Sequence, residues 1–219
     1  MYFLYLLAIS TTLGCSVIAF VGAGKQAIED QKLIEVPAIY SLENKSVAVV
    51  IDTDMAILFE HQMVASIIAV AVAGRINENV PNVEVLHPDI VANWQFQTPQ
   101  WAAMPAIEIA EALKVDRVIY IDLQEYRLNP PGNQELWEGR SAAVIGIIEA
   151  DGYEQDGFVE TFNIDVVFPR RPSVLTRYEA SGADIEMGLL NEFIKQTSWL
   201  FYFHIEPKHP DRYRPELDS

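Results

Sequence analysis

Cysteine is nearly absent from this sequence, which has one, Cys15, in 219 residues. A single cysteine cannot form a disulfide within one chain. Positive charge is also scarce: 15 Lys and Arg side chains stand against 31 Asp and Glu, which gives a formal net charge of −16 at pH 7. A surface of that sign repels phosphate backbones, so nucleic-acid binding is not expected. Half of the residues are hydrophobic, which is enough for a full core in one domain.

The motifs of common catalytic sites are missing as well. The four histidines, at positions 61, 87, 204 and 209, do not fall in a metal-binding spacing such as His-Glu-x-x-His. There is no Gly-x-Ser-x-Gly nucleophile motif. The Gly-Ala-Gly-Lys sequence at 22–25 lacks the first glycine and the final Ser or Thr of a phosphate-binding loop. The sequence therefore predicts no cofactor and favours a role that is not catalytic.

The N-terminal segment has no charged side chain in residues 1–24, and positions 2–9 form the compact apolar run YFLYLLAI. Small residues follow, and then Leu13, Gly14 and Cys15. This arrangement resembles the signal peptide of bacterial lipoproteins. The resemblance implies that residues 1–14 are a signal peptide, that Cys15 becomes a lipidated N-terminus carrying palmitate, and that residues 15–45 form a tether. The protein would then be anchored in the cell envelope, facing the periplasm or the cell exterior.

Two other interpretations of this segment stay open. Residues 1–24 are long enough to cross a bilayer core of about 30 Å as an uncleaved helix, although three glycines interrupt the apolar run. The segment could also be a buried N-terminal helix of a soluble protein. The small residue directly before Cys15 favours lipidation over both alternatives.

The apolar pattern downstream predicts one α/β (α+β) layer domain over residues 46–204. Strands are indicated by β-branched or alternating runs at 46–52, 83–86, 118–128, 137–149 and 158–168. Three main helices are indicated by apolar positions at helical spacing in 60–79, 105–113 and 182–201. The expected order is β-α-β-α-β-β-β-α, with a mixed sheet of about five strands that ends in a hairpin. Residues 205–219 are rich in proline and are expected to form an extended tail.

The sequence also makes more specific predictions about single elements of this fold. In the 60–79 helix, the apolar stripe is predicted to comprise Met63, Val64, Ile67, Ile68, Ala71 and Val72. A short helix is expected at 88–97, and an edge strand at 173–179. Residues 26–43 show no clear period and are expected to form a tether with one helical turn at most, without a strand, and no second domain is predicted.

A second resemblance lies where the 105–113 helix runs into the next strand. Residues 110–116 (AEALKVD) are followed by VIY at 118–120. In this stretch, and in the order of elements over 46–203, the chain is similar to the periplasmic αβ domain shared by the curli-secretion lipoprotein CsgG, the TolB amino-terminal domain and the penicillin-binding-protein activator lipoproteins. The resemblance implies an envelope lipoprotein that binds other proteins and has no catalytic residues.

Two small groups of residues are candidates for a site. Asp52 and Asp54 end the first predicted strand, where paired carboxylates can bind Mg²⁺ or Ca²⁺, although aspartate is also common in solvated turns. Trp94, Phe96 and Trp101 are aromatic residues that could bind a partner or pack into the core.

Three functions follow from these candidates. The favoured one is a lipid-anchored binding or assembly module that contacts envelope proteins. The alternatives are a membrane-anchored, metal-dependent enzyme using Asp52 and Asp54, and a structural homo-oligomer.

Overall fold

The computed structural model describes residues 31–152, 157–170 and 174–210. The chain forms two compact units: Ala38–Phe203, and a smaller one made of Met1–Pro37 with His204–Ser219. The predicted signal peptide and Cys15 lie outside the described residues. Within the described part of the chain, no helix is long and apolar enough to span a membrane.

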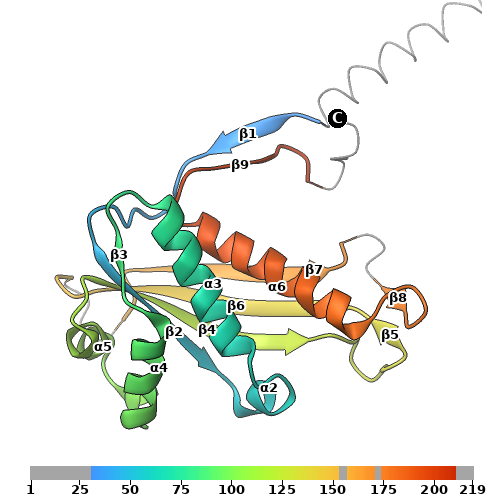
Figure 1. The fold of residues 1–219 in the computed structure, drawn as a ribbon, viewed down its shortest axis with the longest axis horizontal. Coiled ribbons are helices and arrows are strands. Elements are labelled where there is room, and N and C mark those ends of the chain that lie inside the picture. The colour runs from blue at the N-terminus through green and yellow to red at the C-terminus, as the bar shows by residue number, and fades with distance from the viewer. Residues whose placement is uncertain (1–30, 153–156, 171–173, 211–219) are drawn as a thin grey trace, which may run out of the picture. The chain divides into compact units, whose positions relative to one another are not determined.

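The larger unit is built on a mixed sheet of five strands. Their order across the sheet is β3 (Glu84–Val85), β2 (Ser46–Thr53), β4 (Arg117–Arg127), β6 (Gly139–Glu149) and β7 (Glu160–Phe168). The central β2 is parallel to both β3 and β4, whereas β4, β6 and β7 run antiparallel to one another. The predicted α/β class, mixed sheet and final hairpin are confirmed (Figure 1).

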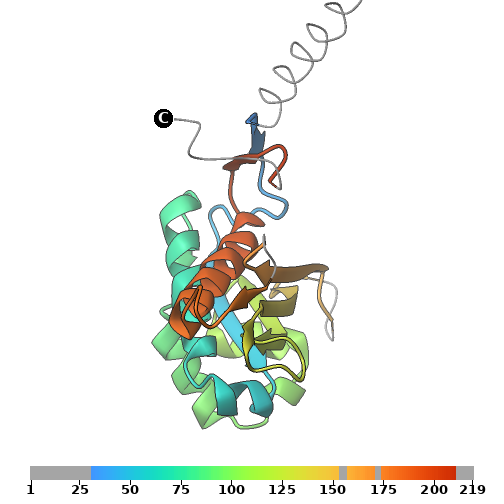
Figure 2. The ribbon, with the colours of Figure 1, turned by 90° about the vertical axis from the view of Figure 1, so that its right-hand side faces the viewer.

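Helices cover both faces of the sheet, which explains why β2 and β4 are apolar without alternation. Neighbouring residues of a strand point to opposite faces. Val49 of β2 packs in one cluster with α3 (Val64–Asn79) and α6 (Gly182–Trp199). Val50 packs in a second cluster with α4 (Pro88–Gln97) and α5 (Ala106–Leu113). The turned view in Figure 2 shows the helices on either side of the strands.

The helix α5 and the strand that follows it form as the sequence predicted. Ala106, Ile109, Ala110 and Leu113 are all buried, so one face of α5 lies on the sheet. The helix ends where Lys114 adopts a left-handed conformation with φ 57°, a common geometry at helix C-termini. The helix α6 begins with a reciprocal capping box, in which Ser181 and Asp184 each accept a hydrogen bond from the other's backbone N–H.

Several elements differ from the prediction. A separate helix, α2 (Met55–Glu60), precedes α3, because Asp54 caps its N-terminus and the chain leaves helical geometry at His61. The predicted 137–149 strand is divided into β5 (Leu136–Trp137) and β6. The predicted edge strand is reduced to β8 (Leu175–Thr176), which pairs with β5 in a small sheet of its own rather than with the main sheet.

The smaller unit contains a strand pair that the sequence did not indicate. Here β1 (Leu33–Val36) runs antiparallel to β9 (His204–Pro207), with Val36 opposite His204. The tether was expected to contain no strand, and the chain from His204 onward was expected to be unpaired. Backbone hydrogen bonding between two segments so far apart in sequence leaves no local signature in either of them.

Candidate protein-binding surface

Five large apolar side chains lie exposed on two consecutive helices. Met55 and Phe59 belong to α2, Met63 caps the start of α3, and Ile67 and Val70 belong to α3. Their exposed fractions range from 41% to 84%. We call this set the α2–α3 surface. Single exposed apolar residues are common on proteins, but a group along one helical region is typical of a surface that contacts something else.

The composition of α3 makes this surface unusual. No charged residue occurs in 62–74. On one side of the helix Val64, Ile68 and Val72 are buried in the core. On the opposite side Ile67 and Val70 are exposed, where a helix on a protein surface usually carries polar residues. In a chain of net charge −16, such a region has no charge to desolvate when another protein surface covers it.

The sequence prediction for this helix was half right. Val64, Ile68 and Val72 are buried as expected. Met63 and Ile67, which were placed in the same stripe, are exposed. When a helix is apolar around its whole circumference, the spacing of apolar residues does not tell which side faces the core. The signal for the α2–α3 surface was instead the absence of charge between His61 and Arg75.

A cavity of about 230 Å³ adjoins this surface, between α3 and α4. The residues that line the cavity include four with small side chains, Ala65, Ser66, Ala69 and Ala92. Among the described residues β3 pairs only with the first two residues of β2, so the edge of β2 further along has no strand beside it. The Nε2 of Gln95 donates a hydrogen bond of 3.1 Å to the carbonyl oxygen of Ile51. One backbone acceptor on that edge of β2 thus has a side-chain partner.

The two candidate metal ligands are engaged in separate contacts. Asp52 accepts a hydrogen bond of 2.6 Å from the hydroxyl of Tyr120. Asp54 accepts one of 2.9 Å from the backbone N–H of Ala56, as the cap of α2. No group of three or more His, Cys, Asp or Glu side chains that could hold a metal ion occurs in the part of the chain that the structure describes. Each of the two carboxylates therefore has a hydrogen-bond partner within the protein.

The three candidate aromatic residues divide between packing and exposure. Trp94 and Trp101 are partly buried against the second core cluster, with ring centroids 6.2 Å apart. Trp101 also lies 6.0 Å from the ring of Tyr120. Phe96, by contrast, is 85% exposed. The tryptophans thus contribute to the core, as in the alternative interpretation of their role, and only Phe96 presents its ring to solvent.

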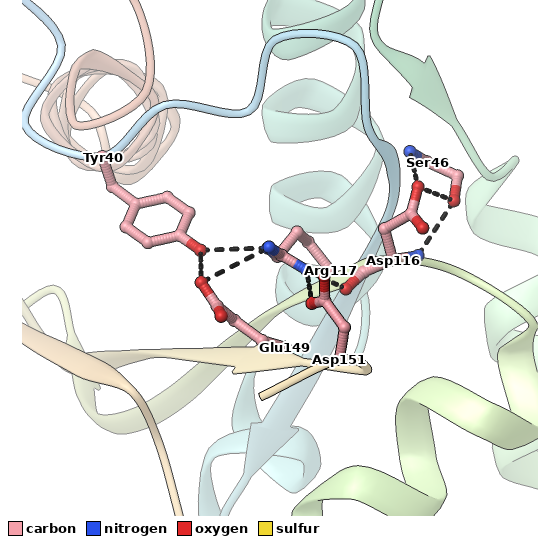
Figure 3. A network of polar contacts seen from close by, with 6 residues as sticks. All are labelled: Tyr40, Ser46, Asp116, Arg117, Glu149 and Asp151. Atoms are coloured by element: carbon pink, nitrogen blue, oxygen red, sulfur yellow. Dashed lines mark hydrogen bonds and ion pairs between the residues drawn. The ribbon is translucent and has the colours of Figure 1, made fainter. Parts of the chain in front are cut away.

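A network of polar side chains lies where β2 and β4 begin, at the end of the sheet opposite to Asp52 (Figure 3). At its centre is Arg117, whose side chain is only 9% exposed. Its Nε donates to the hydroxyl of Tyr40 at 3.1 Å and lies 3.4 Å from Oε1 of Glu149. Its Nη1 donates to Oδ1 of Asp151 at 2.5 Å. A buried guanidinium needs such partners, because an unpaired buried charge is strongly unfavourable.

The contacts in this network shift the pKa values of Tyr40 and Asp151. Burial, helped by the hydrogen bond to Glu149, raises the pKa of Tyr40 to about 12, so the phenol stays protonated at neutral pH. The hydrogen bond and charge of Arg117 hold the pKa of Asp151 below its ordinary value. These groups stabilise one another in their usual protonation states.

Asp116, next to Arg117 in sequence, forms hydrogen bonds with Ser46 whose contribution to stability depends on pH. Its Oδ2 accepts hydrogen bonds of 2.8 Å from both the backbone N–H and the hydroxyl of Ser46. These bonds, the backbone one first, hold the pKa of Asp116 below its ordinary value. Because the folded pKa is depressed, the stabilisation is present above the unfolded pKa and is lost as the pH falls through the folded pKa.

The substitution Ser46→Ala is expected to raise the pKa of Asp116 and to lower the free energy of unfolding at pH 7 by no more than about 1 kcal/mol, since solvent screens an exposed carboxylate. The difference between the two proteins should shrink as the pH falls through the depressed pKa of Asp116, where the folded protein takes up the proton. Urea unfolding at pH 7 and pH 3, together with an NMR titration of Asp116, measures both effects. A difference that stayed constant with pH would rule out the hydrogen bond to the carboxylate as its cause.

Comparison with known proteins assigns this chain to no family. No protein-family model matches the sequence, and no curated protein matches it either. One solved structure that aligns is a PelC dodecamer from Paraburkholderia phytofirmans, with 11% identity, a TM-score of 0.44, and coverage of 78% of this chain and 97% of that chain. A second is lipoprotein GNA1162 from Neisseria meningitidis, with 12% identity, a TM-score of 0.44, and coverage of 69% and 96%.

A third aligned structure is the LpoB C-terminal domain from Salmonella enterica, with 13% identity, a TM-score of 0.30, and coverage of 59% of this chain and 87% of that chain. Identities and scores at this level assign neither a family nor a function. The likeness to the CsgG and TolB domains that the sequence predicted stays a prediction.

Proposed function

We propose that this protein is a lipid-anchored component of the cell envelope that works by binding protein surfaces, without catalysis. The observation that carries the proposal is the α2–α3 surface. It combines exposed Met and Phe side chains, which are enriched in protein interfaces, with a complete lack of charge over residues 62–74. Large apolar side chains at the centre of an interface supply most of its binding energy.

The proposed anchor rests on the sequence. The apolar run at 2–9 leads to Leu13, Gly14 and the only cysteine of the chain, Cys15. Lipid at Cys15 would hold the protein at a membrane through the segment that precedes β1, and would leave the larger unit free to meet partners. The high negative charge favours a lipid anchor over adsorption to an anionic membrane surface.

The polar side chains support a binding role rather than an enzymatic one. Arg117, Glu149 and Tyr40 form contacts with one another that account for their burial. Asp52 and Asp54, the weak candidates for a metal site, are engaged by Tyr120 and by the α2 backbone. No observation favours the metal-dependent enzyme over the binding module.

The anchor is tested by the intact mass of the full chain extracted from its native membrane fraction. The expected mass is that of a chain that begins at Cys15 and carries fatty acyl groups. An unmodified chain that retained Met1 would contradict the anchor.

The binding surface is tested by a photoreactive phenylalanine analogue introduced in place of Phe59. A matched control carries the same analogue in place of Tyr178, an aromatic residue that is fully exposed. Irradiation in the native membrane is expected to link residue 59 to a protein at high yield, and residue 178 at a yield at least about ten times lower. Equal yields at the two positions would mean that the α2–α3 surface has no special role.

A further inference from the structure

The outward side of α3 follows the spacing of a helix that packs against another helix. Met63, Ile67, Val70 and Gly74 succeed one another at intervals of four, three and four residues. This is the interval pattern of the a and d positions in a coiled-coil seam. All four residues are exposed. The core side of the same helix is already occupied, so the seam is additional to the contacts that hold α3 on the sheet.

The seam is complementary to itself when two copies of the helix run antiparallel. In antiparallel pairs an a position faces a d position of the other helix. Centring the pair between Ile67 and Val70 places each Ile67 against Val70 of the second copy. It also places each Met63 against Gly74 of the second copy. A Cβ at Gly74 would have no atom within 4 Å, so there is space there for a long, adaptable methionine side chain.

We propose that the protein forms a homodimer in which α3 packs antiparallel against α3 of a second copy. The size match between Met63 and Gly74, both on one helix, favours a second copy over an unrelated partner. Each chain carries −16, so two copies repel one another overall, and the lack of charge in residues 62–74 allows them to meet there without placing like charges in contact. The proposal rests on the proposed function in one respect, because a shared membrane would raise the local concentration of the two copies.

The exposed residues of α2 extend the same contact. Phe59 lies one helical turn before Met63 in sequence and is 84% exposed. In the antiparallel register that places Met63 against Gly74, the start of one α3 lies beside the end of the other, so Phe59 would lie toward the last turn of α3 of the second copy, around Glu78. The small residues that line the neighbouring cavity, such as Ser66 and Ala69, allow close approach of a second backbone.

The first test measures the mass of the full chain in detergent by sedimentation and light scattering over a range of concentrations. The parent chain is expected to be dimeric. Met63→Glu is expected to raise the dissociation constant by at least about 100-fold, since it brings two charges into the seam of each dimer. Met187→Glu is the matched control, because Met187 lies on α6 and is 60% exposed against 63% for Met63. The control is expected to remain dimeric.

The second test determines the direction of the helices. Met63→Cys and Gly74→Cys chains are mixed and oxidised, and linked peptides are identified by mass, so that disulfides through Cys15 are not counted. A disulfide between position 63 of one chain and position 74 of the other is expected in the mixture. Neither variant alone is expected to form one at its own position, because in the antiparallel pair the two copies of residue 63 lie about 16 Å apart along the axis.

The outcomes separate this inference from the function on which it rests. A 63-to-63 disulfide would overturn the antiparallel pairing, and a dimer that Met63→Glu leaves intact would overturn the role of α3. A chain that is monomeric at every concentration, while residue 59 still links to a different protein in the membrane, would overturn the dimer and leave the proposed function standing. If the chain extracted from its native membrane carried no lipid at Cys15 and still formed a dimer through α3, the inference would be supported and the anchor contradicted.

Discussion

Replacing Arg117 with methionine is expected to lower the free energy of unfolding by about 3 kcal/mol. Methionine keeps most of the volume of the buried stem, so the loss comes from the guanidinium and leaves no large cavity. Without it, the side chain of Glu149 and the hydroxyl of Tyr40 keep only each other as partners among the described residues, at a site that is largely closed to water. Urea unfolding followed by the fluorescence of the tryptophans measures the change.

The contribution of the ion pair is isolated by a double-mutant cycle of Arg117→Met with Glu149→Gln. The double variant is expected to lose less stability than the sum of the two single variants, because neither charge is then left unpaired. Tyr40→Phe removes the two hydrogen bonds of the hydroxyl, one donated to Glu149 and one accepted from Arg117, and should cost about 2 kcal/mol. Asp151 is mostly exposed, so its pair with Arg117 is expected to contribute little. An Arg117→Met loss below about 1 kcal/mol would show that the network is not structural.

Gly146→Val is expected to lower the free energy of unfolding by about 3 kcal/mol through overpacking. Gly146 lies in the middle of β6, and a Cβ there would come within 2.4 to 2.6 Å of three ring atoms of Phe158. One of these atoms is Cγ, so rotating the ring does not remove the clash. The ring of Phe158 also lies 5.3 Å from that of Tyr120, and displacing it would disturb this aromatic packing. Thermal and urea unfolding measure the loss.

A second variant distinguishes this clash from a general intolerance of valine at position 146. Adding Phe158→Ala to Gly146→Val removes the ring that the valine meets. The double variant is expected to be more stable than Gly146→Val alone, since the new side chain can then use the space of the ring. A double variant less stable than either single one would mean that the ring and the valine do not compete for the same space.

The main sheet was predictable because the apolar pattern within each strand indicates which of its faces are buried. Val118–Ile121 is apolar on both sides, as a central strand between two helical layers requires. In β7 Ile164 and Val166 are buried and alternate with the exposed Asn163 and Asp165, a period that indicates a strand with one inward face. The loop between β6 and β7 contains Gly152, and its turn-rich composition was enough to predict the hairpin.

Features that depend on distant partners were not predictable. The burial of Arg117 requires Tyr40 and Glu149, which lie 77 residues before it and 32 residues after it in sequence. The strand β1 depends on β9. The α2–α3 surface escaped prediction for a different reason: Met63 and Ile67 look like core residues, and only the position of the sheet decides that Val64 and Ile68 are buried instead.

The pairing of β1 with β9 brings together the two points where the chain enters and leaves the larger unit. Val36 lies opposite His204, directly before and after residues 38–203. A unit whose ends are neighbours is suited to domain insertion, because two short linkers are enough to join it to a surface loop of a host protein. The same proximity suits circular permutation, with the old ends joined and new ends opened at the exposed turn around Gly132.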